Sequence, residues 1–405
     1  MSRPDEMEPI SIKELKGRAG ESPVQADLQV QLAQTSLKET RNGKAYRELV
    51  CADAEGSLTL RVWSDHPMFS KSESLNAQQF LLISGQWVDK GPFGIEPKSW
   101  DFRDLTADEQ EEMLRGPESL RAKQSQDYEY IQRSVSALAD PRLRLVSRHF
   151  LETYGERFLR TAAARTYHHA RRGGLVEHVA QMMRAATSLL LVYPRLNADL
   201  VITGVLFHDC GKLWENSYLK NGFTMPYNEM GELLGHIPLG IELINKLWRE
   251  LASDESIAEE WESLTPSTED VRSHLLHLVA SHHGTLEFGS PIVPKTPEAM
   301  LLHFVDNIDA KLEMFNEGYE KSALIGKNVY DRQRPLFHTL IQPLEKCGPS
   351  AQSDKVAAAS VTEPATSSAS PDTAGTTFAA KNALLDGNQG ASTNEGSIVG
   401  GKEEL

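Results

Sequence analysis

The sequence predicts a multidomain chain of mixed α and β class: a small β-barrel, then an all-α domain, then a disordered C-terminal tail. Three observations predict this order. Runs that alternate apolar and polar residues, separated by turn signals, fill residues 23–104. Helical periodicity then continues to about residue 345, and Ala, Ser, Thr, Gly and Asn dominate from 350 to 401. The 405 residues are enough for two or three domains.

Composition limits the partners and the compartment. The net charge of -15 argues against a protein that coats nucleic acid through its overall charge, although local basic patches can still bind phosphates. The three cysteines form no CxxC pair, which favours a reducing cytoplasm. Residues 1–22 are polar and are expected to form a flexible lead-in without a signal segment. Because no apolar run is long enough to span a bilayer, we expect no membrane partner.

Five strands are expected within residues 23–104. The runs 27–33, 46–52, 57–63 and 80–88 come first, and the fifth follows the Gly91-Pro92 turn at 93–97. Five short strands favour the OB-fold, a five-stranded β-barrel that often binds nucleic acid. Since aromatic rings stack on bases and cations follow phosphates, we predict nucleic-acid contacts at Lys44, Tyr46, Arg61 and Trp63. Ordinary packing on the strands is the alternative for each aromatic ring.

Helices are expected for the rest of the ordered chain. Residues 105–165 are predicted to be a helical connector that starts at the capping signal Thr106-Ala107-Asp108-Glu109. In the following domain, 166–345, ten of the thirteen histidines lie between His168 and His303. One of its helices is expected to begin near Glu232 and to carry His236 one turn in. The tail, 346–405, is predicted to be disordered because it has too little apolar surface to offset its ordering entropy.

Seven histidine and aspartate residues lie near a helix end or beside an apolar face on five successive predicted helices. They are His178, His208, Asp209, His236, His282, His283 and Asp306. Burying this many imidazoles and carboxylates without a metal would be costly. One such residue alone is more simply a hydrogen-bonded or capping residue, and His274, His277 and His303 keep that interpretation. Imidazole and carboxylate ligands without thiolate suit Mn, Fe, Co or Ni, with Mg as a further option.

The order of these residues resembles that of the HD-domain metal-dependent phosphohydrolases, over about residues 168–315. A closer resemblance is to the bacterial 3′-5′ exoribonucleases of the YhaM type, which join an N-terminal OB-fold to an HD domain. It is carried by His168-His169-Ala170, Gly173-Gly174-Leu175-Val176-Glu177-His178, Phe207-His208-Asp209-Cys210-Gly211-Lys212, Leu234-Gly235-His236-Ile237, Ser281-His282-His283-Gly284, Glu287-Phe288-Gly289-Ser290-Pro291 and Thr296-Pro297-Glu298-Ala299. The last two stretches are the more specific, because HD enzymes in general do not share them.

The resemblance implies a centre with two divalent metals, of which Mn is favoured and Mg, Co or Fe are alternatives. It implies a first site made of His178, His208, Asp209 and Asp306, with Asp209 bridging to a second metal at His236, His282 and His283. Such a pair can activate water and clamp both oxygens of a phosphoryl transfer. It further implies a 3′-5′ exoribonuclease that cuts single-stranded RNA, and the sequence leaves open whether single-stranded DNA is also a substrate. We predict Asp209, His208 and Lys212 as catalytic residues.

Further phosphate contacts are predicted at His168, His169 and Arg172, just before the first ligand. Lys212 could neutralise a phosphate oxygen, and a cation that stabilises a helix C-terminus is an equally good interpretation. Two other functions stay open. One is an HD phosphohydrolase of nucleotides or cyclic nucleotides, and the other is a non-catalytic nucleic-acid-binding protein with a structural HD domain. The sequence leaves open whether the chain forms a homo-oligomer.

Overall fold

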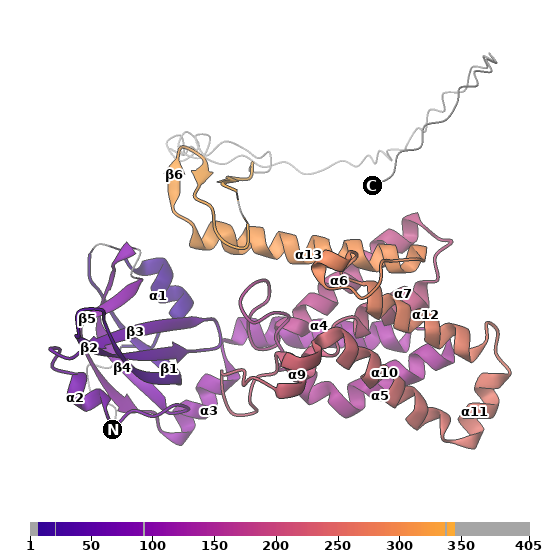
Figure 1. Ribbon diagram of the computed structural model, residues 1–405, viewed down its shortest axis with the longest axis horizontal. Coiled ribbons are helices and arrows are strands. Elements are labelled where there is room, and N and C mark those ends of the chain that lie inside the picture. The colour runs from indigo at the N-terminus through magenta and orange to yellow at the C-terminus, as the bar shows by residue number, and fades with distance from the viewer. Residues whose placement is uncertain (1–6, 21, 92–93, 337, 345–405) are drawn as a thin grey trace, which may run out of the picture. The chain divides into compact units, whose positions relative to one another are not determined.

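A computed structural model of the protein describes residues 7–344 except positions 21, 92–93 and 337, and Figure 1 shows the course of the chain. The predicted disordered tail, 346–405, lies outside the described residues. Strands come first and helices follow, as the sequence predicts. Within the described ranges, no helix is both long and apolar enough to cross a membrane.

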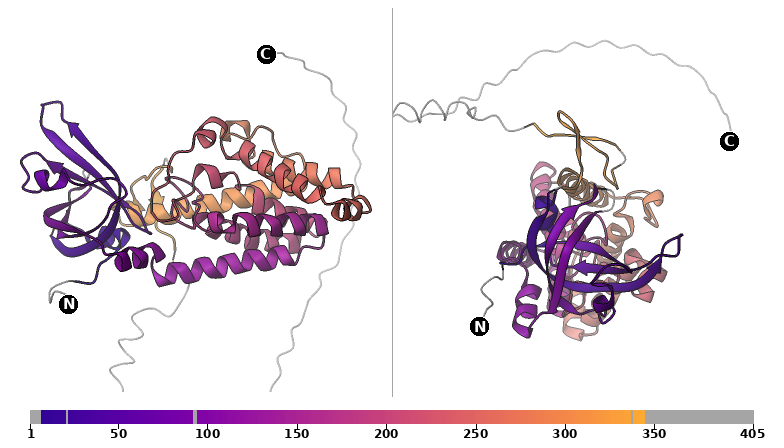
Figure 2. Two further views of the ribbon diagram at one scale, coloured as in Figure 1. Left: turned by 90° about the horizontal axis from the view of Figure 1, so that it is seen from below. Right: turned by 90° about the vertical axis from the view of Figure 1, so that its left-hand side faces the viewer.

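The N-terminal sheet has five antiparallel strands. They are β1 (Val24–Glu39), β2 (Ala45–Ala52), β3 (Ser57–Trp63), β4 (Phe80–Asp89) and β5 (Ile95–Asp104), in the order β3-β2-β1-β4-β5. The long β1 pairs with β4 along its first half and with β2 along its second. The outer strands β3 and β5 contact each other, so the sheet curls into the predicted five-stranded OB-type barrel (Figure 2). Strand β5 runs seven residues beyond the predicted end at residue 97.

A short helix closes the core of this barrel. Helix α1 (Ile12–Arg18) begins at Ser11, whose hydroxyl accepts a hydrogen bond from the Glu14 amide. Its apolar residues Ile12 and Leu15 are fully buried and pack in the same cluster as Leu28 and other inward-facing strand residues. The predicted flexible lead-in is therefore wrong for this segment, because two apolar side chains one turn apart give the helix a face to bury. The small helix α2 (Phe69–Ser72) lies between β3 and β4.

The predicted connector is helical but packs as part of the second core. Its helices are α3 (Ala107–Arg115), α4 (Glu118–Ser136) and α5 (Pro141–Phe158). The Thr106 hydroxyl accepts from the Glu109 amide while the Glu109 carboxylate accepts from the Thr106 amide, which is the predicted cap. Val146 and Phe150 of α5 are fully buried in one cluster with Phe207 of the following domain. The connector thus supplies part of the scaffold for the histidine-rich helices.

The histidine-rich part consists of longer helices with short ones between them. The longer ones are α6 (Gly174–Val192), α7 (Ala198–Phe207), α10 (His236–Ala252), α12 (Thr268–Ser281) and α13 (Pro297–Lys321), and the short ones are α8 (Lys212–Glu215), α9 (Glu229–Leu234), α11 (Glu255–Glu262) and η2 (Leu286–Phe288). Helix α7 is buried at every residue from Leu200 to Phe207, which fits its apolar sequence. It therefore ends in the interior and delivers His208 and Asp209 there.

The end of the described chain differs from the predicted continuous helix. After α13, strands β6 (Leu324–Gly326), β7 (Val329–Tyr330) and β8 (Leu340–Ile341) form a small antiparallel sheet. Helical periodicity overestimates the helix here because the turn residues Gly326-Lys327-Asn328 separate two short apolar runs.

A buried carboxylate joins the connector to α6. Glu177 has no exposed surface, and its oxygens accept from Lys123 Nζ at 2.8 Å, from Gln124 Nε2 at 3.0 Å and from Arg171 Nη2 at 2.7 Å. Burial would raise the pKa of this carboxyl, but Arg171, Gln124 and Lys123 outweigh it and hold the pKa at about 2. Because the folded pKa is depressed, this stabilisation is present above about pH 4.5 and is lost as the pH falls towards 2.

Replacing this carboxylate should destabilise the fold. We expect Glu177→Ala to lower the free energy of unfolding by about 3–5 kcal/mol, since it leaves cationic partners without their buried counter-charge. Urea unfolding at neutral pH measures the change. The exposed ion pair Glu269–Arg272 provides a control, because Glu269→Ala should cost less than about 1 kcal/mol. Equal losses in both variants would contradict the assigned role of Glu177.

Candidate metal centre

One group of predicted ligands brings together three helices. His178 lies one turn into α6, His208 ends α7, and Asp306 lies on α13. Their ligand atoms all lie within 4.8 Å of one another. The Nε2 atoms of His178 and His208 are 3.2 Å apart, and Asp306 Oδ1 is 3.4 Å from His178 Nε2. We call these residues the first trio.

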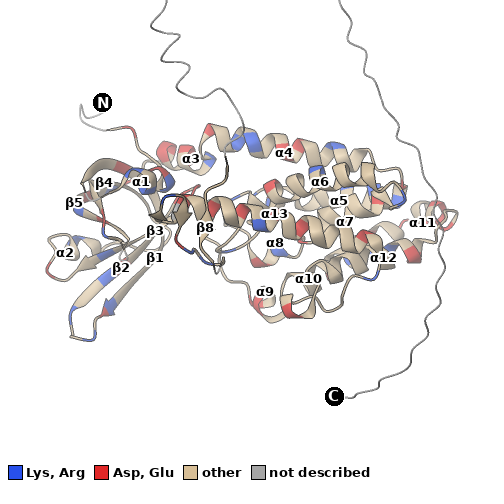
Figure 3. Ribbon diagram, turned by 90° about the horizontal axis from the view of Figure 1, so that it is seen from above, with Lys and Arg blue, Asp and Glu red and all other residues tan. Residues whose placement is uncertain are grey.

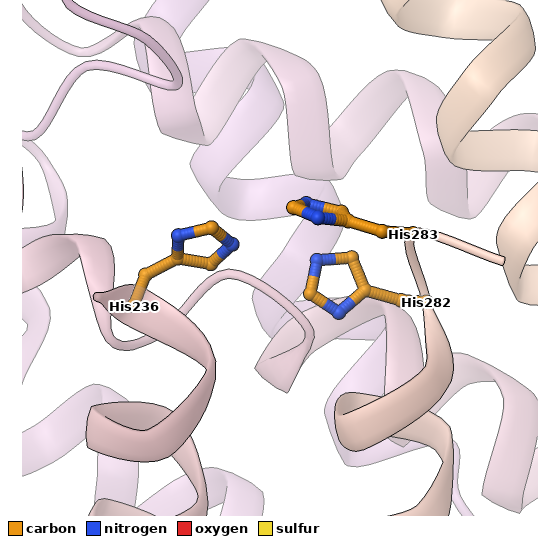
Figure 4. A group of neighbouring side chains, drawn as sticks. All are labelled: His236, His282 and His283. Atoms are coloured by element: carbon orange, nitrogen blue, oxygen red, sulfur yellow. The ribbon is translucent and has the colours of Figure 1, made fainter. Parts of the chain in front are cut away.

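A second trio consists of His236, His282 and His283, whose ligand atoms also lie within 4.8 Å of one another. Figure 4 shows the His236 ring facing the other two rings from a different helix. His236 is the first residue of α10, because Gly235 at φ 72° separates α9 from α10. The predicted helix through Glu232 and His236 is therefore two helices, and the break places His236 at a helix start. His282 and His283 follow the end of α12.

Asp209 lies between the two trios. Its Oδ2 is 3.3 Å from His208 Nε2, while its Oδ1 is 3.5 Å from His236 Nε2 and 3.6 Å from His282 Nε2. One carboxylate thus offers one oxygen to each trio. This is the arrangement that a ligand shared between two cations requires.

In four histidines the Nδ1 atom lies beside a hydrogen-bond acceptor. In the neutral ring this places the proton on Nδ1 and leaves a lone pair on Nε2. His208 Nδ1 donates to the Val205 carbonyl at 2.8 Å, and His282 Nδ1 donates to the Val279 carbonyl at 2.7 Å. His283 Nδ1 donates to the Phe288 carbonyl at 2.7 Å, and His178 Nδ1 lies 2.7 Å from Asp309 Oδ2. A carbonyl oxygen can only accept, so the proton of a neutral ring stays on Nδ1. The facing Nε2 atoms are then suited to bind a cation.

Unpartnered buried atoms test whether metal ions fit here. Asp209 Oδ1, His236 Nε2 and His282 Nε2 are buried and have no hydrogen-bond partner among the described residues. Such atoms are costly in a protein interior unless something satisfies them. Divalent cations would satisfy all three, and the nitrogen and oxygen donor set suits Mn, Fe, Co or Mg. The residues present therefore fit a metal centre.

The charges at the site also favour a metal centre. Burial would raise the pKa of Asp209, but Lys212 and His208 outweigh it and keep that pKa well below its usual range. Burial would lower the pKa of His178, but Asp306 and Asp309 raise it to about 9. Burial and the neighbouring His282 lower the pKa of His283 to about 4, which keeps this ring neutral and able to coordinate. The first trio thus stabilises positive charge.

Two carboxylates behind the trios orient their rings. Asp309 Oδ2 lies 2.7 Å from His178 Nδ1 and 3.0 Å from His169 Nε2, and Asp309 Oδ1 accepts from Gln181 at 2.7 Å. Glu215 Oε2 lies 3.2 Å from His236 Nδ1. Neither was a predicted site residue. Asp309 follows Asp306 by one helical turn, a spacing that places both on one face and could have signalled it.

Removing Asp309 should weaken metal binding. Asp309→Ala is expected to lower the Mn²⁺ affinity by about 10- to 100-fold, because His178 loses the partner that fixes its tautomer and orientation. Asp309→Asn should recover part of this, since the amide oxygen can still accept from His178 Nδ1. Calorimetric titration of the metal-free protein with Mn²⁺ checks both variants. An unchanged affinity in Asp309→Ala would contradict the orienting role.

Close backbone contacts hold the turn after Asp209 and the second trio in place. A Cβ at Gly211 would lie 1.9 Å from the His236 carbonyl oxygen, so only glycine lets the turn after Asp209 pass so near α10. A Cβ at Gly284, where φ is 81°, would lie 2.2 Å from the His303 ring. That ring donates through Nδ1 to the His282 carbonyl at 2.8 Å. His303 therefore supports the segment that carries His282 and His283.

The residues predicted to contact phosphate around the centre differ in the groups that they contact in the structure. Lys212 is 8% exposed and its Nζ lies 2.6 Å from Asp209 Oδ2, so its partner is this carboxylate and not a helix C-terminus. His169 is buried against Asp309, and Arg172 donates to the carbonyls of Leu219, Lys220 and Gly222. We therefore withdraw His169 and Arg172 as phosphate contacts.

His168 is the member of this group that adjoins the centre. Its ring lies 6.0 Å from the His178 ring, and its Nδ1 is buried without a partner in the described part of the chain. Burial and the charge of Lys212 lower its pKa to about 3, so the ring is neutral. A neutral ring with an unpartnered nitrogen beside the first trio can donate a hydrogen bond to a ligand bound there.

The predicted contacts on the barrel form one cluster. Tyr46 and Trp63 are paired across β2 and β3, and their ring centres are 4.9 Å apart. Lys44 Nζ lies 5.3 Å from the Trp63 ring centre and 2.8 Å from Asp65, while Arg61 lies 3.9 Å from both Glu48 and Glu96. Figure 3 shows both positive and negative residues on the strands of this barrel. Both predicted cations thus lie beside carboxylates.

Comparisons with known proteins agree with this geometry. The HD domain family model matches residues 175–311, a range that includes all seven predicted ligands. The chain is 29% identical over 324 residues to a protein of Bacillus pumilus named 3′-5′ exoribonuclease YhaM, a match that covers 78% of this chain and 96% of the relative. It is 29% identical over 333 residues to a protein of the same name from a Geobacillus species, covering 78% of this chain and 94% of that one.

Proposed function

This chain is an HD-domain protein of the YhaM type, and from that premise we propose that it is a metal-dependent 3′-5′ exoribonuclease. Its substrate would be single-stranded RNA, with single-stranded DNA as a second substrate. The observation that carries the proposal is the position of Asp209, which has one oxygen towards each trio. We assign hydrolysis to residues 166–345 and strand binding to residues 23–104.

The residues of the two trios would hold two divalent ions, with Asp209 shared between them. When bound, such ions lower the pKa of a coordinated water and neutralise charge on the phosphate. Asp309 and Glu215 orient the rings of His178 and His236. Lys212 balances the charge of Asp209 and is close enough to attract a phosphate oxygen to the same place.

The barrel would hold the strand while its end is cut. The neighbouring rings of Tyr46 and Trp63 suit base stacking, and Lys44 lies beside them. Since the nearby carboxylates reduce the positive charge of this surface, stacking contributes more to affinity than charge does. We expect weak salt dependence for binding at this cluster. A cytoplasmic location remains a prediction from cysteine usage.

A substrate panel tests the proposal against the alternative of a nucleotide phosphohydrolase. The full-length protein with Mn²⁺ is incubated with single-stranded RNA, single-stranded DNA, nucleoside triphosphates and a cyclic dinucleotide. We expect nucleoside monophosphates to be released from RNA, and turnover of the small nucleotides to be at least about 100-fold slower. Turnover of free nucleotides with intact RNA would contradict the proposed function.

A further inference from the structure

A short loop projects from the protein directly after the second trio. Residues 285–289 are exposed, whereas Gly284 and Ser290 on either side are buried. The loop contains η2 and presents two large apolar side chains to solvent, with Phe288 70% exposed and Leu286 63% exposed. Exposed aromatic side chains beside a polar cluster are typical of ligand-binding surfaces.

The loop is tied to the metal centre through its backbone. His283 Nδ1 donates to the Phe288 carbonyl at 2.7 Å, so the residue that orients a predicted ligand is also the exposed aromatic one. The loop starts at Gly284, which packs on the His303 ring, and turns back at Gly289 with φ 91°. Phe288 is therefore held close to the second trio and does not depend on side-chain packing for its place.

Exposed apolar residues also lie just before His236 in the chain. The His236 ring lies 5.1 Å from the His283 ring, and α9 ends immediately before His236. The last residues of α9, Leu233 and Leu234, are 75% and 52% exposed. The residues of the second trio are thus adjacent in the chain to exposed apolar residues of two elements, α9 and the 285–289 loop, which suits a ligand with one charged part and one flat apolar part.

We propose that Phe288 stacks on a base at the 3′ end of the strand and so positions the terminal phosphodiester at the metal centre. This inference rests on the proposed function. A nucleotide has the required two parts, since its phosphate would reach the trios while its base covers the aromatic ring. Every base has a π-face, so this contact gives affinity without sequence preference.

The test compares Phe288→Ala with Phe288→Tyr in the full-length protein loaded with Mn²⁺. We expect Phe288→Ala to raise the KM for a short single-stranded RNA by about 5- to 100-fold with little change in kcat, and Phe288→Tyr to restore it. Leu191→Ala is the matched control. Leu191 is 82% exposed on α6 and lies thirteen residues, or about 20 Å along the helix, from His178.

A second substrate isolates the base. RNA with abasic sites at its two 3′-terminal positions should raise the KM of the wild type by the same factor, but should not raise the KM of Phe288→Ala further. Equal KM values for Phe288→Ala and Leu191→Ala would overturn the proposal. So would a loss of Mn²⁺ affinity in Phe288→Ala, or dissociation of an oligomer in that variant without a change in KM, because each would assign the side chain to another task.

Binding measurements separate this inference from the proposed function. In the Asp209→Asn background, fluorescence anisotropy with the same RNAs makes the same comparison without turnover. Failure of the wild type to cleave RNA would refute the proposed function. If Phe288→Ala bound the normal RNA as tightly as the unsubstituted side chain does, with the abasic RNA as reference, base stacking by Phe288 would be refuted and the proposed function would not.

Discussion

Asp209→Asn is expected to lower kcat for RNA hydrolysis by at least about 1,000-fold, while affinity for single-stranded RNA changes by less than about threefold. The substitution keeps the size of the side chain but removes the charge that both trios share. Asp209 Oδ1 faces two rings of the second trio and Oδ2 faces His208 of the first. An amide can present only one oxygen, so it cannot serve both trios.

Strand affinity should survive because the barrel cluster at Tyr46 and Trp63 lies on different elements. Single-turnover kinetics gives the chemical rate, and fluorescence anisotropy gives the affinity. Asp331→Asn is the control, since Asp331 is exposed and distant in sequence from the trios. Circular dichroism should show that both variants are folded. An Asp209→Asn protein that degrades RNA at more than about a tenth of the normal rate would contradict the shared-ligand role.

Removing the metal should abolish hydrolysis and also lower the stability of the helical part. The three unpartnered atoms of Asp209, His236 and His282 are buried, so ions that satisfy them bind the folded state far better than the unfolded one. At a Mn²⁺ concentration about 100 times the Kd, the expected gain is about 2.7 kcal/mol. For a unit of the size of the helical part that corresponds to a rise in Tm of roughly 5–10 °C.

Thermal unfolding with chelator or with Mn²⁺ measures this shift. Asp209→Asn is the matched variant, because it keeps the six other predicted ligands and should show a smaller shift. Mg²⁺ should give a weaker effect than Mn²⁺ at equal concentration, since imidazole ligands suit Mn²⁺ better. Identical Tm values in chelator and in Mn²⁺ would contradict a resident metal at these residues.

Elements with a local signal could be predicted from the sequence. The hydroxyl of Thr296 accepts from the Ala299 amide and the side chain of Asn197 accepts from the Leu200 amide, so residue types that favour N-caps begin α13 and α7. Alternation identified β2 and β3 at nearly their observed bounds. The buried course of α7 follows from a run that is apolar on every side. In each of these cases the information lies within a few residues.

The remaining features depend on contacts distant in the sequence. The pairing of Asp309 with His178 joins residues 131 positions apart, and no periodicity predicts it. Arg172 resembled a phosphate contact, but three carbonyls of a loop almost 50 residues away engage it. The break at Gly235 was missed because a single glycine within a helical pattern is often tolerated. The seven predicted metal ligands could be identified because so many histidine and aspartate residues near helix ends require a common metal, even though their spacing in the sequence does not show which of them lie together.

The most direct test of a metal-dependent 3′-5′ exoribonuclease is a time course on RNA labelled at its 5′ end. The wild-type protein is incubated with a single-stranded RNA in Mn²⁺, in Mg²⁺ and in excess chelator, and the products are separated by length. We expect a ladder of products that shortens one nucleotide at a time from the 3′ end in Mn²⁺, and intact RNA in chelator. Cleavage that continues unchanged in chelator, or RNA that stays intact in Mn²⁺ and Mg²⁺ alike, would contradict this expectation.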